Sequence, residues 1–308
     1  MKTIAIYNNK GGVGKSTLTL FLADFFSSGT ITINKRKPRV LVLDLDGQSS
    51  SATSLLGLQR VARAKAEKQN LSHLLLALKQ NQDVDISKYL IKREAGKTPT
   101  RKISLGELWV MPTERASAIK LEQSFDCQTC VRLMNIVKNR LKKQFDIVLM
   151  DLPANIDERN KLSLAGLLIA DHIIIPTEPT RLTLNTITDT FNMIHYVRGL
   201  GNGQGKAPKI AGILLNKADK RSKQYKLHYK ELYDTAARHD TVVLENMLPT
   251  APALSTASDD SLEFVLLRER YSTYYDKVRK IALEVAERCG YRLKSKKKSR
   301  KKDIAKAC

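Results

Sequence analysis

A glycine-rich stretch near the N-terminus constrains the fold more than any other feature of the sequence. Lys10-Gly11-Gly12-Val13-Gly14-Lys15-Ser16-Thr17 directly follows the apolar run Thr3–Tyr7 and opens the helical pattern Lys15–Phe26. Because glycines have no Cβ, the backbone can turn and point successive amides at the oxygens of a bound phosphate. The positive end of the following helix favours the same anion. The order of strand, loop and helix therefore predicts a phosphate-binding loop in an α/β protein.

The rest of the chain alternates short apolar runs with longer helical patterns. Continuous apolar runs are typical of strands buried on both faces, and the alternation favours a doubly wound, mostly parallel sheet with helices on both faces. The predicted strands are Thr3–Tyr7, Arg39–Leu45, Glu107–Met111, Asp146–Asp151, His172–Pro176, Ile210–Asn216 and Val242–Met247. The predicted helices are Lys15–Phe26, Cys127–Lys143, Leu182–Arg198, Ser222–Arg238 and a long one over Ser261–Cys289.

The charge of the chain is strongly basic, with 53 Lys and Arg against 31 Asp and Glu and a formal net charge of +22. Such an excess predicts adhesion to polyanions, of which nucleic acid and an anionic membrane surface are the candidates. Two segments are especially basic: residues 60–102, which we expect to form a surface insertion, and the lysine-rich C-terminus. We expect one domain over residues 1–290 and a disordered basic tail over residues 291–308, since the tail has hardly any apolar residues.

Several classes of protein are excluded by the sequence. The apolar stretch Leu162–Ala170 is too short to span a bilayer, and the N-terminus lacks the pattern of a signal peptide. Cys127 and Cys130 lie on a predicted helix with no second pair nearby, which favours buried thiols over a metal site. We therefore expect a cytoplasmic protein.

The glycine-rich loop matches the Walker A pattern except that Asn9 stands in place of its first glycine. In this pattern Lys15 neutralises the β- and γ-phosphates and the Ser16 hydroxyl is a ligand of Mg²⁺. A second lysine, Lys10, opens the loop. With it the sequence resembles the ParA/MinD family of "deviant" Walker A ATPases, and most of all its ParA (Soj-like) members. The resemblance implies ATP and Mg²⁺ as cofactors, an ATP-sandwiched homodimer, and a Lys10 that reaches the phosphates of the partner subunit.

Carboxylates follow two of the predicted strands. Leu43-Asp44-Leu45-Asp46-Gly47-Gln48 resembles the family's switch I, with Gly47 where proline is usual. Asp44 would lie near Mg²⁺, and the resemblance gives Asp46 the task of orienting the attacking water. In Phe145-Asp146-Ile147-Val148-Leu149-Met150-Asp151, Asp151 closes an apolar run as a Walker B aspartate would, and is expected to support Mg²⁺ through water.

The base-binding residues are predicted at the last strands of the sheet. Asn216 ends a strand where relatives place a residue that touches adenine, and the loop Pro249-Thr250-Ala251 would flank the base. Asn216-Lys217-Ala218-Asp219 also mimics the guanine-reading motif of GTPases, so ATP and GTP both stay open on the residues alone. The expected set of loop contacts to the nucleotide is Lys10, Gly11, Gly12, Val13, Gly14, Lys15, Ser16 and Thr17.

A basic cluster follows Asn216. In partition proteins of the family a basic residue in this loop grips DNA, and Arg221 falls at the matching place among Lys217, Lys220, Lys223 and Lys226. The family's other DNA-binding arginine is replaced here by Thr250. Contacts of lysine and arginine to phosphates carry no sequence information, so binding should be non-specific and salt-dependent. The tail could equally bind RNA or acidic lipids.

The resemblance thus implies a nucleoid-associated ParA-type ATPase that dimerises on ATP, binds DNA non-specifically and drives plasmid or chromosome partition. A ParB-like or other cargo adaptor would stimulate hydrolysis. The alternative is a MinD-like or other cargo-positioning ATPase that acts at a membrane or on a protein assembly. A membrane role is disfavoured because residues 293–308 hold only Leu293 and Ile304 as large aliphatic residues. A metabolic P-loop enzyme would need a substrate or cysteine constellation that the sequence does not show.

Overall fold

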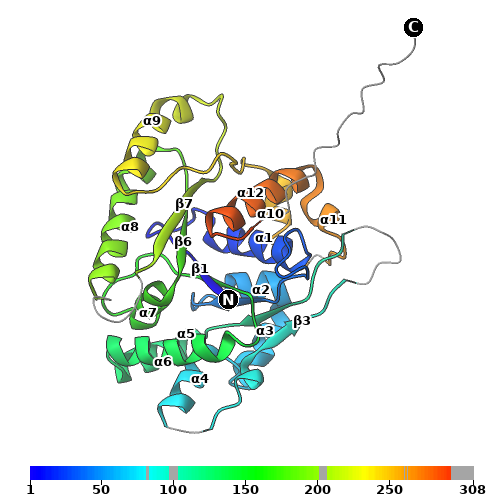
Figure 1. Ribbon diagram of the computed structural model, residues 1–308, viewed down its shortest axis with the longest axis vertical. Helices are drawn as coiled ribbons and strands as arrows, with labels where there is room; N and C mark the ends of the chain where they lie inside the picture. The colour runs from blue at the N-terminus through cyan, green and yellow to red at the C-terminus, as the bar shows by residue number, and fades with distance from the viewer. Residues whose placement is uncertain (81–82, 97–102, 201–206, 260, 262, 293–308) are drawn as a thin grey trace.

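The computed structural model describes residues 1–80, 83–96, 103–200, 207–259, 261 and 263–292, and in this part of the chain seven strands form one sheet (Figure 1). The strand order is β3-β4-β2-β5-β1-β6-β7, and every neighbouring pair is parallel except β3 with β4. The strands are β1 (Lys2–Ile6), β2 (Val40–Asp44), β3 (Ile91–Arg93), β4 (Leu108–Met111), β5 (Ile147–Asp151), β6 (His172–Thr177) and β7 (Lys209–Leu215). The predicted doubly wound, mostly parallel sheet is confirmed.

Helices cover both faces of the sheet, because the side chains of each strand alternate between two hydrophobic clusters. On β1, Ile4 and Ile6 belong to one cluster, whereas Ala5 and Tyr7 belong to the other. The first face packs against α1 (Lys15–Ser27), α2 (Ser50–Leu56), α3 (Leu58–Ala66), α10 (Pro252–Thr256), α11 (Leu267–Tyr271) and α12 (Tyr275–Arg288). The second packs against α4 (Leu71–Lys79), α5 (Arg115–Ser124), α6 (Cys127–Leu141), α7 (Lys161–Ile169), α8 (Arg181–Leu200) and α9 (Lys223–Arg238).

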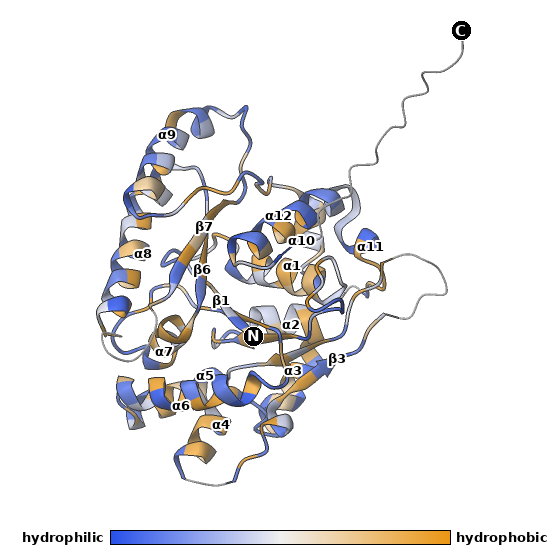
Figure 2. Ribbon diagram, in the orientation of Figure 1, coloured by the Kyte–Doolittle hydropathy of each residue, from blue (hydrophilic) through white to orange (hydrophobic). Residues whose placement is uncertain are grey.

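Burial differs sharply between helices, and hydropathy follows it. Helix α7 is buried almost throughout and is hydrophobic along its length, whereas α9 has a buried stripe and a charged outer side (Figure 2). A helix that is apolar on all sides must be enclosed by other elements, while a striped one lies at the surface. Helix α9 is therefore an outer helix of the fold.

The predicted strand Val242–Met247 is wrong. Only Val243 pairs with β7, through a single parallel bridge to Ile213. The carboxylate of Glu284 on α12 accepts the backbone amides of Glu245 and Asn246 at 2.6 and 3.1 Å. These amides are therefore turned away from β7, and no regular ladder can continue along the segment.

The predicted long helix over Ser261–Cys289 is also wrong as a single element. It is divided into α11, a 3₁₀ turn η2 (Ser272–Tyr274) and α12, and Ser272 has a φ of 46°. Arg270 is buried and donates to the carbonyls of Ala257 and Ser54 at 2.8 and 3.0 Å. The positive φ of Ser272 ends α11 and separates it from α12. Leu262 lies outside the described residues.

The segment 60–102 is not a simple surface insertion where the structure describes it. Helix α4 buries Leu71, Leu74 and Leu75 in the main core, and β3, preceded by the turn η1 (Ile86–Tyr89), becomes an edge strand of the sheet. The basic composition concealed these apolar positions because most of the described lysines and arginines of the segment lie on the outer side of the same elements, whereas Arg93 of β3 is buried. Residues 81–82 and 97–102, and residues 293–308 of the predicted tail, lie outside the described part.

Candidate functional site

The glycine-rich loop forms an open cradle at the end of β1. Gly12 and Gly14 have φ angles of 75° and 90°, which other residues rarely adopt, and Gly14 is the N-cap of α1. A Cβ on Gly11 or Gly12 would meet nothing within 4 Å. The space in front of the loop is therefore open to a ligand, and the N-terminus of α1 faces it.

Lys15 extends its ammonium group under this loop. Its Nζ donates to the carbonyl oxygens of Asn8 at 3.0 Å and Lys10 at 2.9 Å. Burial lowers the pKa of Lys15, while the nearby carboxylates of Asp151 and Asp46 act in the opposite direction. The loop carbonyls thus hold a cation in the place where phosphate oxygens are expected.

Lys10 and Asn9 make contacts that sequence reasoning missed. The ammonium of Lys10 donates to Oγ1 of Thr183 on α8 of the same chain at 3.0 Å. Asn9 accepts the amide of Ile156 on its side-chain oxygen at 3.1 Å and the amide of Asn155 on its carbonyl at 2.9 Å. The residue that replaces the first glycine therefore ties the loop to the segment after Asp151. No local pattern in the sequence indicates this contact, because the two segments are more than 140 residues apart along the chain.

Asp44 and Asp151 end the adjacent strands β2 and β5 in the same register. Both are fully buried. Asp44 accepts the amide of Ala52 in α2 at 2.8 Å, and burial together with the charge of Asp151 raises its pKa well above the ordinary value. Burial likewise raises the pKa of Asp151, and the charge of Asp46 adds to this effect. Two carboxylates are thus held together without enough positive charge between them.

The residues at this point fit a magnesium ion. Both carboxylate oxygens of Asp151 and the hydroxyl of Ser51 are buried without a hydrogen-bond partner among the described residues. Mg²⁺ prefers oxygen ligands and usually takes one or two carboxylates, with water and phosphate oxygens completing the shell. Ser16, Asp44 and Asp151 would supply the protein side of such a shell. Asp46 is half-buried beside them, and Ser51 is an additional oxygen that the sequence did not single out.

Asn216 and Lys217, at the end of β7, contact the glycine-rich loop from behind. The side-chain amide of Asn216 donates to the carbonyl of Val13 at 2.9 Å, and Lys217 Nζ donates to the carbonyl of Gly12 at 3.0 Å. A Cβ on Gly14 would lie 2.2 Å from Nδ2 of Asn216, so only glycine fits there. In this arrangement Asn216 supports the loop.

The other predicted base-site residues lie at the same end of the sheet. The amide of Leu248 donates to the carbonyl of Leu215 at 2.9 Å, which places the half-buried Pro249 and exposed Thr250 beside the end of β7, with Ala251 buried next to them. In the guanine-like motif, Asp219 is bound by Arg221, whose Nε and Nη2 donate to it at 3.1 and 3.0 Å. Its carboxylate is therefore already engaged.

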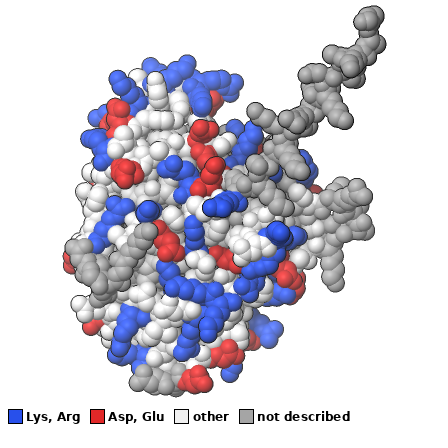
Figure 3. All heavy atoms as spheres, in the orientation of Figure 1, with Lys and Arg blue, Asp and Glu red and all other residues white. Residues whose placement is uncertain are grey.

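Basic side chains gather at the top of the view in Figure 3, over α9 and the loop that leads into it. Lys220, Arg221, Lys223 and Lys226 are exposed there. Arg221 forms an exposed ion pair with Asp219, a kind of contact that adds little to stability. The predicted DNA-binding residues are thus brought together, except that Lys217 is directed to the phosphate loop.

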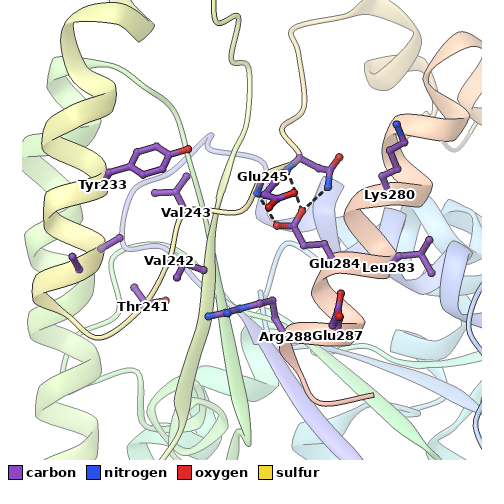
Figure 4. Close-up of a pocket in the computed structure, with 13 residues that line it drawn as sticks. Tyr233, Thr241, Val242, Val243, Glu245, Lys280, Leu283, Glu284, Glu287 and Arg288 are labelled. Carbon is purple, nitrogen blue, oxygen red and sulfur yellow. Dashed lines mark hydrogen bonds between the residues drawn. The ribbon is translucent and has the colours of Figure 1, made fainter. Parts of the chain in front are cut away.

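A groove of about 740 Å³ lies between α9 and α12 (Figure 4). Its floor is the segment Thr241–Asn246, and Glu284, which binds Asn246 through both the backbone amide and the side-chain amide, lies across it. No residue of the phosphate loop lines this groove. The Glu284 carboxylate in this groove binds Glu245 and Asn246, in the segment that was predicted to be a strand.

The remaining predictions concern cysteines and membranes. Cys130 is buried in α6 and Cys127 is half-buried at its start, so the expected burial is confirmed for Cys130. In the part of the chain that the structure describes, no three His, Cys, Asp or Glu side chains are grouped to hold a metal by themselves. None of the described helices has the length and apolar character needed to cross a bilayer.

The cradle, its two lysines and the paired strand-end aspartates define a P-loop nucleotide-binding protein of the doubly wound α/β class. The model of the AAA_31 family, described as an AAA domain, matches residues 1–204, and the chain belongs to this ParA/MinD-like family of P-loop ATPases. The family resemblance read from the sequence is confirmed.

Named relatives are distant. The chromosome partitioning protein ParA of Caulobacter vibrioides is 24% identical over 259 residues, covering 83% of this chain and 84% of that protein. The sporulation initiation inhibitor protein Soj of Bacillus subtilis is 26% identical over 223 residues, covering 72% and 74% of the two chains.

Solved structures share the fold. Apo McdA of Cyanothece superposes with a TM-score of 0.69 at 18% identity, covering 92% of this chain and 99% of that one. Cobyrinic acid a,c-diamide synthase of Mycobacterium smegmatis, with bound ADP and magnesium, gives 0.64 at 20% identity, covering 95% and 97%. The pNOB8 ParA bound to nonspecific DNA gives 0.63 at 19% identity, covering 93% and 98%. Because these proteins differ in activity, the likeness establishes the fold alone.

Proposed function

We propose that this protein is a Mg²⁺-dependent ATPase of the ParA type, which dimerises on ATP, binds DNA non-specifically and moves a cargo such as a plasmid or chromosome. The observation that carries the proposal is the complete deviant loop, with Lys10 and Lys15 both at one phosphate cradle that adjoins a pair of buried carboxylates. A ParB-like or other cargo adaptor would stimulate hydrolysis.

A small set of residues in the proposed nucleotide site binds the phosphates, holds magnesium and orients the attacking water. Backbone amides from Gly11 to Thr17 bind the phosphates, and Lys15 exchanges its carbonyl partners for phosphate oxygens. Magnesium, when bound at Ser16, Asp44 and Asp151, supplies positive charge between the phosphates. Asp46 orients the attacking water, since phosphoryl transfer depends on positioning and charge neutralisation rather than covalent chemistry.

In the proposed dimer, the side chain of Lys10 gives up its contact within its own chain and reaches the nucleotide of the partner subunit. Its ammonium group donates a hydrogen bond to the neutral hydroxyl of Thr183. A phosphate of the partner's nucleotide can take the place of this hydroxyl and bind the ammonium more strongly, because the phosphate is negatively charged. The half-buried position of Lys10 allows this exchange. Lys10 would then act in trans, as an arginine finger does.

Base binding is assigned to Asn216 and to the loop Pro249-Thr250-Ala251. The resemblance to the family favours ATP, and the side-chain amide of Asn216 is able to hydrogen-bond the adenine edge. DNA binding is assigned to Lys220, Arg221, Lys223 and Lys226, whose exposed cations suit the phosphate backbone of a nucleoid.

One assay tests the DNA proposal. Affinity for random duplex DNA is titrated against salt with and without ATP and Mg²⁺, for the wild type, for Arg221→Ala, and for Arg221→Ala combined with truncation after Arg292. Each lost phosphate contact should reduce the slope of log K against log salt by roughly 0.9. Equal affinity of all three proteins at several salt concentrations would remove this surface from DNA binding.

A second candidate is a positioning ATPase whose cargo is a protein assembly. The sequence similarity to the maintenance of carboxysome distribution protein A of Synechococcus elongatus, 26% identical over 214 residues, supports it. The same assay with anionic liposomes in place of DNA tests the MinD-like alternative. Binding to liposomes but not to DNA would favour it.

A further inference from the structure

Two side chains from the end of β7 hold the carbonyl oxygens of consecutive peptides in the phosphate loop. Lys217 Nζ lies 3.0 Å from the carbonyl oxygen of Gly12, and Asn216 Nδ2 lies 2.9 Å from that of Val13. The two residues are adjacent in sequence and so are the two carbonyls. Asn216 is buried, while the side chain of Lys217 is half-exposed.

The ammonium of Lys217 is fixed from a second side. The carboxylate of Glu178, in the connection from β6 to α8, lies 2.8 Å away with its side chain only 19% exposed. The backbone of Lys217 has a φ of 50°, in the left-handed region that lysine rarely adopts. Such strain persists only when surrounding contacts determine it, as the loop carbonyl and Glu178 do here.

The neighbouring lysines differ. Lys220, Lys223 and Lys226 are exposed, and within the described residues none of them forms an ion pair. They are free to meet phosphates of a polyanion. Lys217 would first have to abandon a carboxylate and a loop carbonyl, which makes it a poor DNA contact.

The geometry of the peptide group explains what the hydrogen bonds from Lys217 and Asn216 to the loop carbonyls do; we call these two hydrogen bonds the tether. In a planar trans peptide the C=O of one residue and the N–H of the next point in opposite directions. Holding the carbonyl of Gly12 backward therefore aims the amide of Val13 forward into the cradle, and holding that of Val13 aims the amide of Gly14. Turning this peptide over would change ψ of Gly12, where glycine is permissive, and φ of Val13, where a β-branched residue resists it, so the hydrogen bond from Lys217 reinforces an orientation that Val13 already favours.

We propose that Lys217 is a positioning residue of the nucleotide site, which presets a phosphate-binding amide through Gly12, and that it is not a DNA contact. This inference rests on the proposed nucleotide binding. It divides the basic cluster into one lysine that serves the phosphate loop from behind and three that face outward.

The test measures two quantities on the full chain. The first is the Kd of a fluorescent ATP analogue, MANT-ATP, with Mg²⁺. The second is the salt slope of binding to random duplex DNA. The variants are Lys217→Met, Lys217→Asn, Lys217→Arg and Lys220→Met, with Lys209→Met as the matched control, because Lys209 is an exposed lysine at the opposite end of β7.

Lys217→Met should weaken MANT-ATP binding by about tenfold, given the strength of hydrogen bonds from charged donors, and leave the DNA salt slope unchanged. Lys217→Asn should do the same while favouring the left-handed backbone, which separates loss of the ammonium from backbone strain. Lys217→Arg should restore most of the affinity. Lys220→Met should lower the salt slope by roughly 0.9, and Lys209→Met should change neither quantity.

Three results would overturn the inference. If both Lys217→Met and Lys217→Asn bind MANT-ATP within twofold of the wild type, the tether is irrelevant to the phosphates. If they lower the salt slope as Lys220→Met does, Lys217 contacts DNA after all. If the wild type itself binds no nucleotide, the inference and the proposed function fail together, whereas the first two results leave the proposed function standing.

Discussion

Among the described residues two sites contain fully buried carboxylates, and their charges are compensated to different extents. Asp24 in α1 is 2.6 Å from Arg93 and 3.3 Å from Arg270, and it accepts the hydroxyl of Tyr271 at 2.7 Å. Asp151 in β5 lies beside Asp44, and its oxygens have no hydrogen-bond donor among the described residues. The carboxylate of Asp24 is thus fully paired, whereas that of Asp151 has no partner among the described residues; we call these the saturated site and the open site.

The pKa of each group follows from this difference. Burial alone would raise the pKa of Asp24, but the guanidinium groups of Arg270 and Arg93 outweigh it and hold that pKa below its ordinary value. Burial raises the pKa of Asp151, and the charge of Asp46 adds to the effect. A paired buried charge fastens elements together, here β3 and α11 to α1, whereas an unpaired one marks a place built for a cation that arrives with a ligand.

The largest effect is expected at the open site, from Lys15→Ala. Removing the ammonium leaves the phosphates and the carboxylates without their nearest cation, so nucleotide binding should fall by more than about a hundredfold. Titration with MANT-ATP and Mg²⁺ measures it. Retention of tight binding would contradict the assignment of the loop.

Asp46→Ala should separate binding from turnover at the same site. We expect ATP hydrolysis to fall by about a hundredfold because the attacking water is no longer oriented, while the ATP-bound dimer accumulates. Turnover is measured by phosphate release and the dimer by light scattering. Unchanged turnover would remove Asp46 from this role.

Asp24→Asn tests the saturated site. Breaking a buried pair leaves Arg93 and Arg270 without their counter-charge, so the free energy of unfolding at pH 7 should fall by about 3 kcal/mol in urea titrations. Because the pKa of Asp24 is lowered by folding, its stabilisation is present at neutral pH and is lost as pH falls below about 4, where the variant should approach the wild type.

The matched control is Asp157→Asn, which removes a carboxylate paired with the exposed Arg159 and should change stability by less than about 0.5 kcal/mol. An equal effect of both substitutions would mean that the buried network is not special.

Asp151→Asn should affect stability much less than Asp24→Asn and in the opposite direction, which sharpens the contrast between the two sites. Since folding raises the pKa of Asp151, its negative charge opposes folding at neutral pH. Replacing it with a neutral amide should leave the free energy of unfolding unchanged or raise it by up to about 1 kcal/mol in EDTA, while Mg²⁺-dependent nucleotide binding weakens. A loss of more than about 2 kcal/mol would show that Asp151 is a structural residue.

Much of the site could be predicted from the sequence because it is local. The loop Lys10–Thr17 lies within eight consecutive residues, and Asp44 and Asp151 each end an apolar run. The contacts of Asn9, Thr183 and Glu178 could not be foreseen, since each joins segments that are far apart along the chain. The Asp24 network was missed for the same reason: its arginines belong to a predicted surface insertion and to a predicted continuous helix.

By itself the sequence determined the alternation of strands and helices, the phosphate cradle and the order of the carboxylates, because hydrophobic period and glycine placement act over a few neighbouring residues. Only the tertiary structure decided which lysine of the basic cluster contacts the phosphate loop, which buried carboxylates form ion pairs, and that the apolar run Val242–Met247 forms no regular strand. Those outcomes depend on contacts between residues that are far apart in the sequence, such as Glu284 with the segment Val242–Met247 and Glu178 with Lys217.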